Sequence, residues 1–206
     1  MQAPREPVFM NVPLGTDTKT KGPRGSVEVV GTMAIDAPLA TVLEVCMDHS
    51  RKIEFEGGLE LAEEVAGSKK GTVKSLSGYP AEWVEYKVYH IAPGMSKRDY
   101  VFKGTLVAGK SDDGKLTATL ALTNAELPDK PAAKSGPMVR GYVVCTYVLT
   151  ELSPTSTNLQ LICNLDPMGM FPFCLATAYG GAYPGMMLKR IKAQSLKLLT
   201  EKSSAP

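Results

Sequence analysis

The chain has 206 residues, 44% of them hydrophobic and 21% charged, with a formal net charge of +2 at pH 7. This composition is ordinary for a globular protein and supplies enough apolar material for one sizeable core. The small net charge, without any run of five like charges, argues against a nucleic-acid partner. No apolar run reaches the roughly 18 residues that a membrane-spanning helix requires.

Residues 1–25 lack the apolar stretch of about 7–15 residues that marks a secretory signal. The four cysteines, Cys46, Cys145, Cys163 and Cys174, lie within apolar segments and show no CxxC spacing. We therefore expect reduced, buried thiols and a cytoplasmic location, with a disulfide as the alternative.

The first third of the chain predicts a tail, a strand and two helices. Residues 1–24, rich in Pro, Lys and Thr, predict an extended or partly disordered segment with at most one edge strand, at residues 8–14. The β-branched residues of 27–35 predict a strand. A helix follows, with Asp36 as its N-cap, Pro38 in its first turn and its end near Asp48. A second short helix is expected at residues 59–65.

The rest of the chain predicts five strands and one long helix. Alternation of apolar and polar residues indicates strands at 82–91, 99–107, 115–123, 138–150 and 157–165. Helical spacing returns at residues 172–199. We expect one α+β domain over residues 25–200, in which the long helix lies across a curved antiparallel sheet, followed by a tail at 201–206.

Four short segments occur in a fixed order: residues 95–101 (MSKRDYV), 139–141 (VRG), 165–172 (LDPMGMFP) and 182–190 (AYPGMMLKR). Together they resemble motifs of the START family of lipid-transfer domains, nearest the phosphatidylcholine- and ceramide-transfer branch. The resemblance spans about residues 27–199. It implies a helix-grip fold, in which a curved antiparallel sheet wraps around a long C-terminal helix and leaves an internal lipid cavity.

The resemblance implies a protein that encloses one membrane lipid and shuttles it between membranes. The expected ligand is a glycerophospholipid such as phosphatidylcholine, with ceramide and sterol as alternatives. Sterol carriers of the family place an arginine six residues beyond Arg98, where this chain has Gly104, so a sterol is less favoured. We also expect a monomer that contacts membranes transiently and peripherally.

Arg51 is the first candidate for binding a lipid headgroup, because a guanidinium can hold a phosphate with two parallel hydrogen bonds. A buried arginine needs an acidic partner, and Glu54 and Glu56 are near in sequence. The alternative is that this segment forms an exposed polar turn. Aromatic faces for a choline ammonium are offered by Tyr86, Tyr100, Tyr147 and Tyr183.

Strand parity predicts which side chains face the long helix. Gly104, Ala118 and Gly141 are small residues on this inward face, which favours a cavity over a solid core. The full set of expected lipid-binding residues is Arg51, Glu54, Glu56, Tyr86, Tyr100, Phe102, Leu120, Leu122, Val143, Cys145, Tyr147, Leu161, Tyr179, Tyr183 and Met187.

The final helix contains Gly180, Gly181, Pro184 and Gly185, residues that weaken a helix. Such a helix could act as a lid that bends to admit a lipid, or it could contain a static kink. We expect the gate between this helix and the loop at residues 109–115.

No catalytic, metal or cofactor motif is recognisable. The two histidines, His49 and His90, belong to no cluster with metal-ligand spacing, and no G-x-S-x-G, P-loop or G-x-G-x-x-G is present. We therefore expect no catalytic residue and no cofactor or metal. Two alternatives stay open: a cyclase- or hydrolase-like enzyme of the wider helix-grip superfamily, and a lipid sensor that does not transfer.

Overall fold

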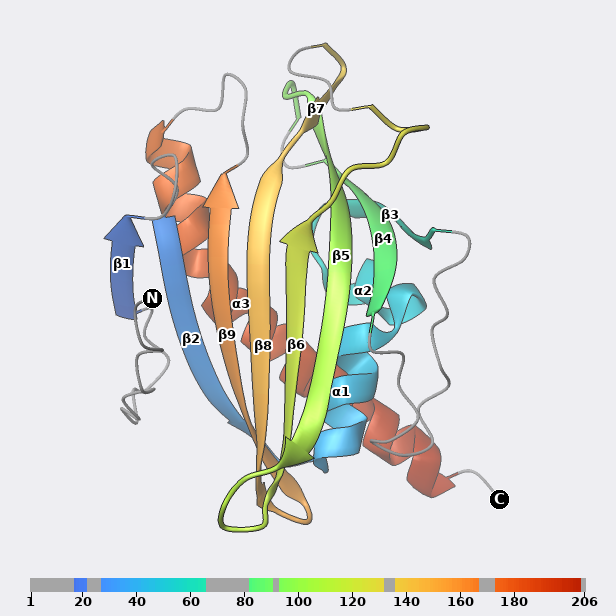
Figure 1. Ribbon diagram of the computed structural model, residues 1–206, viewed down its shortest axis with the longest axis vertical. Helices are drawn as coiled ribbons and strands as arrows, with labels where there is room; N and C mark the ends of the chain where they lie inside the picture. The colour runs from blue at the N-terminus through green and yellow to red at the C-terminus, as the bar shows by residue number, and fades with distance from the viewer. Residues whose placement is uncertain are drawn as a thin grey trace.

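The computed structural model describes residues 17–21, 27–65, 82–90, 93–131, 136–166 and 173–204, with side chains described from residue 28 on except at 165 and 173–181 (Figure 1). The described elements are β1 (Asp17–Lys21), β2 (Val27–Ile35), α1 (Leu39–Met47), α2 (His49–Phe55), β3 (Leu59–Glu64), β4 (Glu82–Tyr89), β5 (Lys97–Lys110), β6 (Leu116–Asn124), β7 (Met138–Arg140), β8 (Tyr142–Ser153), β9 (Ser156–Asp166) and α3 (Phe173–Ser204).

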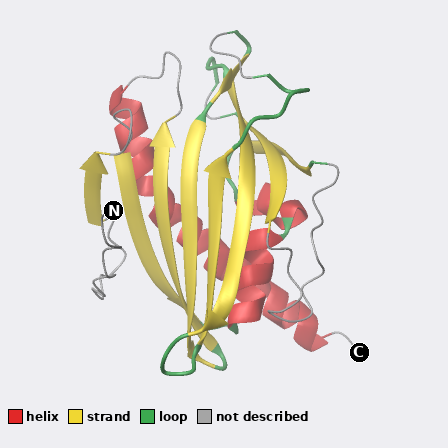
Figure 2. Ribbon diagram, in the orientation of Figure 1, coloured by secondary structure: helices red, strands yellow, loops and turns green. Residues whose placement is uncertain are grey.

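The strands form one curved sheet in the order β1-β2-β9-β8-β6-β5-β4-β3. All neighbours along this path are antiparallel, and the short β7 pairs with β5 in parallel. The three helices lie on one face of the sheet, with α3 running diagonally across it (Figure 2). This arrangement confirms the α+β class and the expected helix-grip architecture.

The core fills the space between the sheet and α3. Leu159 and Leu161 of β9 are fully buried there, together with Met187 and Leu188 of α3. Gly31 of β2 lets α3 approach closely, because a Cβ atom at this position would lie 2.9 Å from Leu188 and 3.0 Å from Pro184. A side chain at residue 31 would push α3 away from the sheet. Within the described part of the chain, no helix is long and apolar enough to cross a membrane.

Most strands lie where the alternation predicts them. The strand expected at residues 27–35 is β2, with the same bounds, and the one expected at 157–165 is β9. The strand expected at 138–150 is interrupted at Gly141, which separates β7 from β8. The expected final helix is α3, which continues to Ser204 and so includes part of the expected tail.

The helix predicted at residues 59–65 is wrong, because these residues form β3, which pairs with β4. The second short helix is instead α2. The carboxylate of Asp48 accepts hydrogen bonds from the backbone N–H groups of Ser50 and Arg51, and this cap starts α2 immediately after α1 ends. The N-cap position of α1 is occupied by Pro38 and not by Asp36. The edge strand considered at residues 8–14 lies outside the described residues.

Candidate functional site

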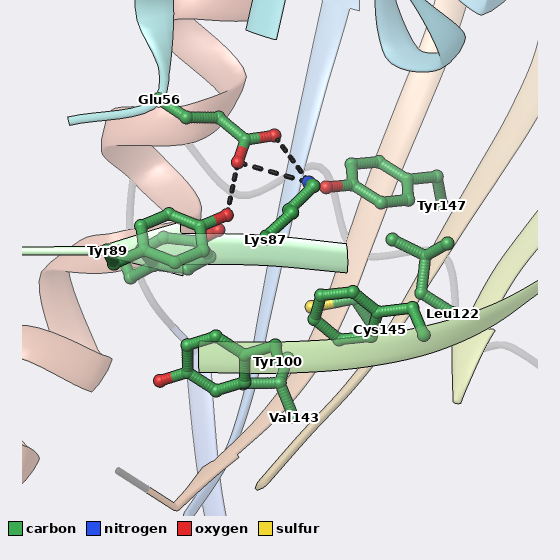
Figure 3. Close-up of a pocket in the computed structure, with 10 residues that line it drawn as sticks. Glu56, Lys87, Tyr89, Tyr100, Leu122, Val143, Cys145 and Tyr147 are labelled. Carbon is green, nitrogen blue, oxygen red and sulfur yellow. Dashed lines mark hydrogen bonds and ion pairs between the residues drawn. The ribbon is translucent and has the colours of Figure 1, made fainter. Parts of the chain in front are cut away.

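A pocket opens on the concave face of the sheet, between strands β4, β5, β6 and β8 and helix α3 (Figure 3). It contains about 510 Å³ of space not filled by atoms, part of it open to solvent. The centre of a water-sized sphere can occupy only about 50 Å³ of this space, which is room for a few water molecules. The lining residues are Glu56, Lys87, Tyr89, Tyr100, Phe102, Leu122, Val143, Cys145, Tyr147 and Tyr183.

Strand register forms an aromatic wall on one side of the pocket. Tyr100 lies opposite Lys87 in the β4–β5 pair, and Phe102 follows two residues later on the same face. The rings of Tyr100 and Phe102 are stacked, with centroids 5.8 Å apart. Tyr89 meets Tyr100 edge to face at 5.5 Å. These contacts hold three aromatic side chains in fixed positions along the pocket.

The polar end of the pocket is formed by Glu56, Lys87 and Tyr89 (Figure 3). The Nζ of Lys87 lies 3.2 Å from each carboxylate oxygen of Glu56, and the hydroxyl of Tyr89 donates to Oε2 of the same carboxylate. Burial lowers the pKa of Lys87, but attraction to Glu56 and Glu85 outweighs it and raises the pKa above its usual value. Burial, reinforced by Glu56, also raises the pKa of Tyr89. Both side chains are therefore protonated at neutral pH.

A second buried carboxylate, Glu85, connects this polar end to α2. Its Oε1 lies 3.5 Å from Nζ of Lys87, and its Oε2 lies 3.4 Å from both Nζ of Lys52 and Nδ1 of His49. Burial raises the pKa of Glu85, but the attraction of Lys52, Lys87 and His49 lowers it well below its usual value. The buried charges alternate in sign in the order Lys52, Glu85, Lys87 and Glu56, so each one lies next to a charge of opposite sign.

Helix α3 holds the end of α2 in place beside the pocket. Nη1 of Arg190 donates a hydrogen bond of 2.9 Å to the backbone carbonyl of Phe55, the last residue of α2. The next residue is Glu56, whose backbone N–H donates to the carbonyl of Lys52. The carboxylate of Glu56 therefore reaches the pocket from a backbone fixed by both helices.

The structure brings together many of the residues expected to bind lipid. Those that line the pocket are Glu56, Tyr100, Phe102, Leu122, Val143, Cys145, Tyr147 and Tyr183. Leu120, Leu161 and Met187 are buried in the adjacent core and do not line it. Tyr179 lies on α3, but its side chain is outside the described residues.

Arg51, Glu54 and Tyr86 lie away from the pocket. The guanidinium of Arg51 pairs with Glu201, 2.8 Å away near the end of α3, and Glu54 is exposed and pairs with Lys197. Tyr86 is on the opposite face of β4 from Lys87, because neighbouring residues of a strand alternate between faces. The orientation of α2 and the parity of β4 therefore place these three side chains outside the site.

Sequence reasoning missed Lys87 and Tyr89, because charged and tyrosine side chains on a strand suggest a solvent-exposed face. Gly104, which was expected to face inward, identifies these residues only once the pairing of β4 with β5 is known. Trp83 lies opposite Gly104 in the register, so Trp83 must also face inward, together with every second residue after it. Those residues include Lys87 and Tyr89.

Gly104 and Gly141, two of the three small residues on the inward face, do not create the hollow. A Cβ atom at Gly104 would lie 2.2 Å from the ring of Trp83, and one at Gly141 would lie 2.3 Å from the ring of Tyr100. Aromatic rings from neighbouring strands fill both spaces, so the expectation that these glycines open a cavity is corrected. The pocket lies between these packed rings and α3.

The gate expected at residues 109–115 is also corrected. This loop follows the end of β5 at Lys110, whereas the pocket contacts the start of β5 at Tyr100 and Phe102. In Figure 1 the loop lies at the lower end of β5 and β6, whereas the pocket-lining residues of β5 lie near the start of that strand, so the loop does not border the pocket.

Among the described residues, no group of three or more His, Cys, Asp or Glu side chains is placed to hold a metal ion.

No family model and no curated protein matches the sequence. Solved structures match its fold. Human STARD10 is 14% identical, with a TM-score of 0.69, over 94% of this chain and 78% of that one. Human StAR-related lipid transfer protein 5 is 16% identical, with a TM-score of 0.67, over 92% and 90%. A STAR-related lipid transfer protein from Xanthomonas axonopodis is 18% identical, with a TM-score of 0.60, over 87% and 98%. The chain thus shares the fold of these proteins.

Proposed function

We propose that this chain binds one membrane lipid in the pocket and carries it between membranes without changing it chemically. The observation that carries the proposal is an apolar pocket with a single polar end, formed by Glu56, Lys87 and Tyr89. Burying an acyl chain contributes about 0.8 kcal/mol per CH₂, but a bilayer offers the same gain. The polar end therefore decides which lipid is held.

The charges at this end favour a zwitterionic headgroup. Lys87 offers an ammonium to a phosphate, and Glu56 offers a carboxylate to a choline or ethanolamine nitrogen. Tyrosine rings such as Tyr100 and Tyr147 add faces that attract a quaternary ammonium. A glycerophospholipid such as phosphatidylcholine matches both charges, whereas ceramide and sterol offer only uncharged polar groups. On binding, the phosphate would take the place of Glu56 as the partner of Lys87, and the choline or ethanolamine nitrogen would take the place of Lys87 as the partner of Glu56.

A lipid with two acyl chains is larger than the pocket in this conformation. Binding therefore requires α3 to move away from the sheet. Pro184 lies inside α3 and cannot donate a backbone hydrogen bond, which weakens the helix beside pocket residue Tyr183. We propose α3 as the moving element, with transient membrane contact during loading and release.

Glu56, Lys87 and Tyr89 also support a second candidate function, an enzyme. A carboxylate, an ammonium and a phenol inside an apolar pocket are the groups that general acid–base catalysis uses. The raised pKa values of Lys87 and Tyr89 make them weak proton donors, so they would stabilise a developing negative charge by hydrogen bonding, and Glu56 would serve as the base. A sensor that binds lipid and does not transfer it would use the same pocket.

One experiment separates these functions. Donor vesicles with labelled phosphatidylcholine are mixed with unlabelled acceptor vesicles and the protein, and the label and its chemical identity are followed by fluorescence and mass spectrometry. Faster movement of intact lipid supports the carrier. A chemically altered lipid contradicts it and favours the enzyme. Lipid that co-purifies with the protein without faster transfer favours the sensor.

A further inference from the structure

Cys145 of β8 and Cys163 of β9 lie directly opposite each other in the antiparallel pair. Both side chains are buried, and their Sγ atoms are 2.7 Å apart. Cys145 lines the pocket, whereas Cys163 is fully buried behind it. The wall of the pocket therefore contains two adjacent thiols, one of which faces the space that a ligand would enter.

The backbone already meets the requirement for a disulfide between these strands. Directly opposite residues of an antiparallel pair have Cα atoms about 4.5–5.5 Å apart, and disulfides accept Cα separations of about 4.4–6.8 Å. Cys46, in contrast, is buried in α1 and makes no sulfur contact within the described part of the chain. Cys46 thus provides an internal comparison for the pair.

The two thiols differ in their surroundings. Cys145 lines the pocket and is open to a small molecule that enters it, whereas Cys163 is fully buried and does not line it. Burial, together with the hydrogen bond to Cys145, raises the pKa of Cys163 well above its usual value, so Cys163 remains a thiol. Cys145 is therefore placed to react first and Cys163 to react second.

We propose that Cys145 and Cys163 form an oxidation site in which a small peroxide entering the pocket converts the two thiols to a cross-strand disulfide. The sulfur of Cys145 attacks one peroxide oxygen and the O–O bond breaks. The second oxygen departs as water, and Cys145 becomes a sulfenic acid. The sulfur of Cys163 then attacks this sulfenic sulfur, the S–S bond forms, and a second water leaves. The two thiols lose two electrons in total, and hydrogen peroxide is reduced to two waters.

The test uses the full chain with Cys174→Ser, because the side chain of Cys174 lies outside the described residues. The reduced protein is treated with hydrogen peroxide, and its intact mass and disulfide-linked peptides are measured. The expected result is the loss of two hydrogen atoms and a peptide pair joining Cys145 to Cys163. The proposal is overturned if both thiols stay reduced in the folded protein while the urea-unfolded chain is oxidised at the same peroxide concentration. A disulfide that includes Cys46 also overturns it.

Single substitutions separate the two roles. Cys163→Ser should abolish the link and leave a sulfenic acid on Cys145 that dimedone traps, whereas Cys46→Ser should oxidise as the parent protein does. Dimedone labelling of Cys163 in Cys145→Ser that is as fast as labelling of Cys145 in Cys163→Ser overturns the assigned order. If Cys163→Ser does not fold, the linked peptides of the parent protein still decide the proposal.

A second arm tests entry through the pocket and rests on the proposed function. Protein loaded from phosphatidylcholine vesicles should form the link roughly tenfold more slowly than lipid-free protein, because access governs thiol oxidation. Equal rates in lipid-loaded and lipid-free protein overturn entry through the pocket. If the link forms and no lipid binds, the oxidation site stands and the proposed function fails, so the two failures are distinguishable.

Discussion

The ammonium of Lys87 on β4 and the carboxylate of Glu56 at the end of α2 form an ion pair, with Nζ 3.2 Å from both oxygens and both side chains 3% exposed. Such a pair adds little net stability, because desolvating two charges offsets their attraction. Removing one partner is costly, since the other charge remains buried. Both residues line the pocket, and under the proposed function they bind the lipid headgroup.

Replacing Lys87 with methionine tests this role. Lys87→Met should weaken phosphatidylcholine binding by about 1.5–3 kcal/mol, the scale of a hydrogen bond to a charged group. It should also lower the free energy of unfolding by about 3–5 kcal/mol, because Glu56 loses its main partner. Vesicle binding and urea unfolding measure the two effects. The double variant Glu56→Gln/Lys87→Met should regain stability and not binding; full binding by the double variant would place the headgroup elsewhere.

Arg51 offers a matched test on the neighbouring helix surface. In Arg51→Ala we expect phosphatidylcholine transfer to be unchanged, because the guanidinium contacts Glu201 and Asp48 and does not line the pocket. Stability should fall by less than about 1 kcal/mol, as is usual for an exposed ion pair. The vesicle transfer assay measures the first effect. A loss of transfer in Arg51→Ala alone would return the headgroup site to Arg51.

Glycine substitutions on β5 test how tightly the sheet packs next to the pocket. Gly104→Ala places a Cβ atom 2.2 Å from the ring of Trp83, so the free energy of unfolding should fall by about 1–3 kcal/mol. Gly109→Ala, on the same strand, meets nothing within 4 Å and should change stability by less than about 0.5 kcal/mol. Urea unfolding compares the two variants. Equal stabilities would mean that Trp83 has room to move.

Acid should destabilise the protein through Glu85. The folded state lowers the pKa of this carboxyl below its usual value of 4.5, so the folded protein binds fewer protons than the unfolded chain. The stabilising contribution is complete above about pH 4.5 and is lost as the pH falls further. Urea unfolding at several pH values from neutral to acid should show this decline.

The matched controls for this acid effect are two glutamine variants. Glu85→Gln should be less stable at pH 7, because Lys52 and Lys87 lose a buried partner, and its acid decline should be shallower. Glu54→Gln removes an exposed carboxylate and should keep the parent decline. A parent-like decline in Glu85→Gln would assign the acid sensitivity to other carboxyl groups.

The sequence alone determined where most strands and the long final helix lie along the chain. β2 was predicted correctly from its β-branched residues and β9 from alternation, because both are local properties of the chain, and the same holds for the helical spacing of α3. α2 was missed because its seven residues are too few to show a helical repeat of apolar positions. Its start depends on the cap formed by the Asp48 carboxylate. β3 was mistaken for a helix, since its short segment is specified by pairing with β4.

Only the tertiary structure decided which side chains meet in the pocket. The sequence did place Tyr100 and Cys145 on the inward face, because successive residues of a strand point to alternate faces of the sheet. The meeting of Lys87 with Glu56 depends on the register of β4 against β5 and on the packing of α2 against α3. Register and helix packing are set by contacts between residues distant in sequence, so no local pattern could place these two charges 3.2 Å apart.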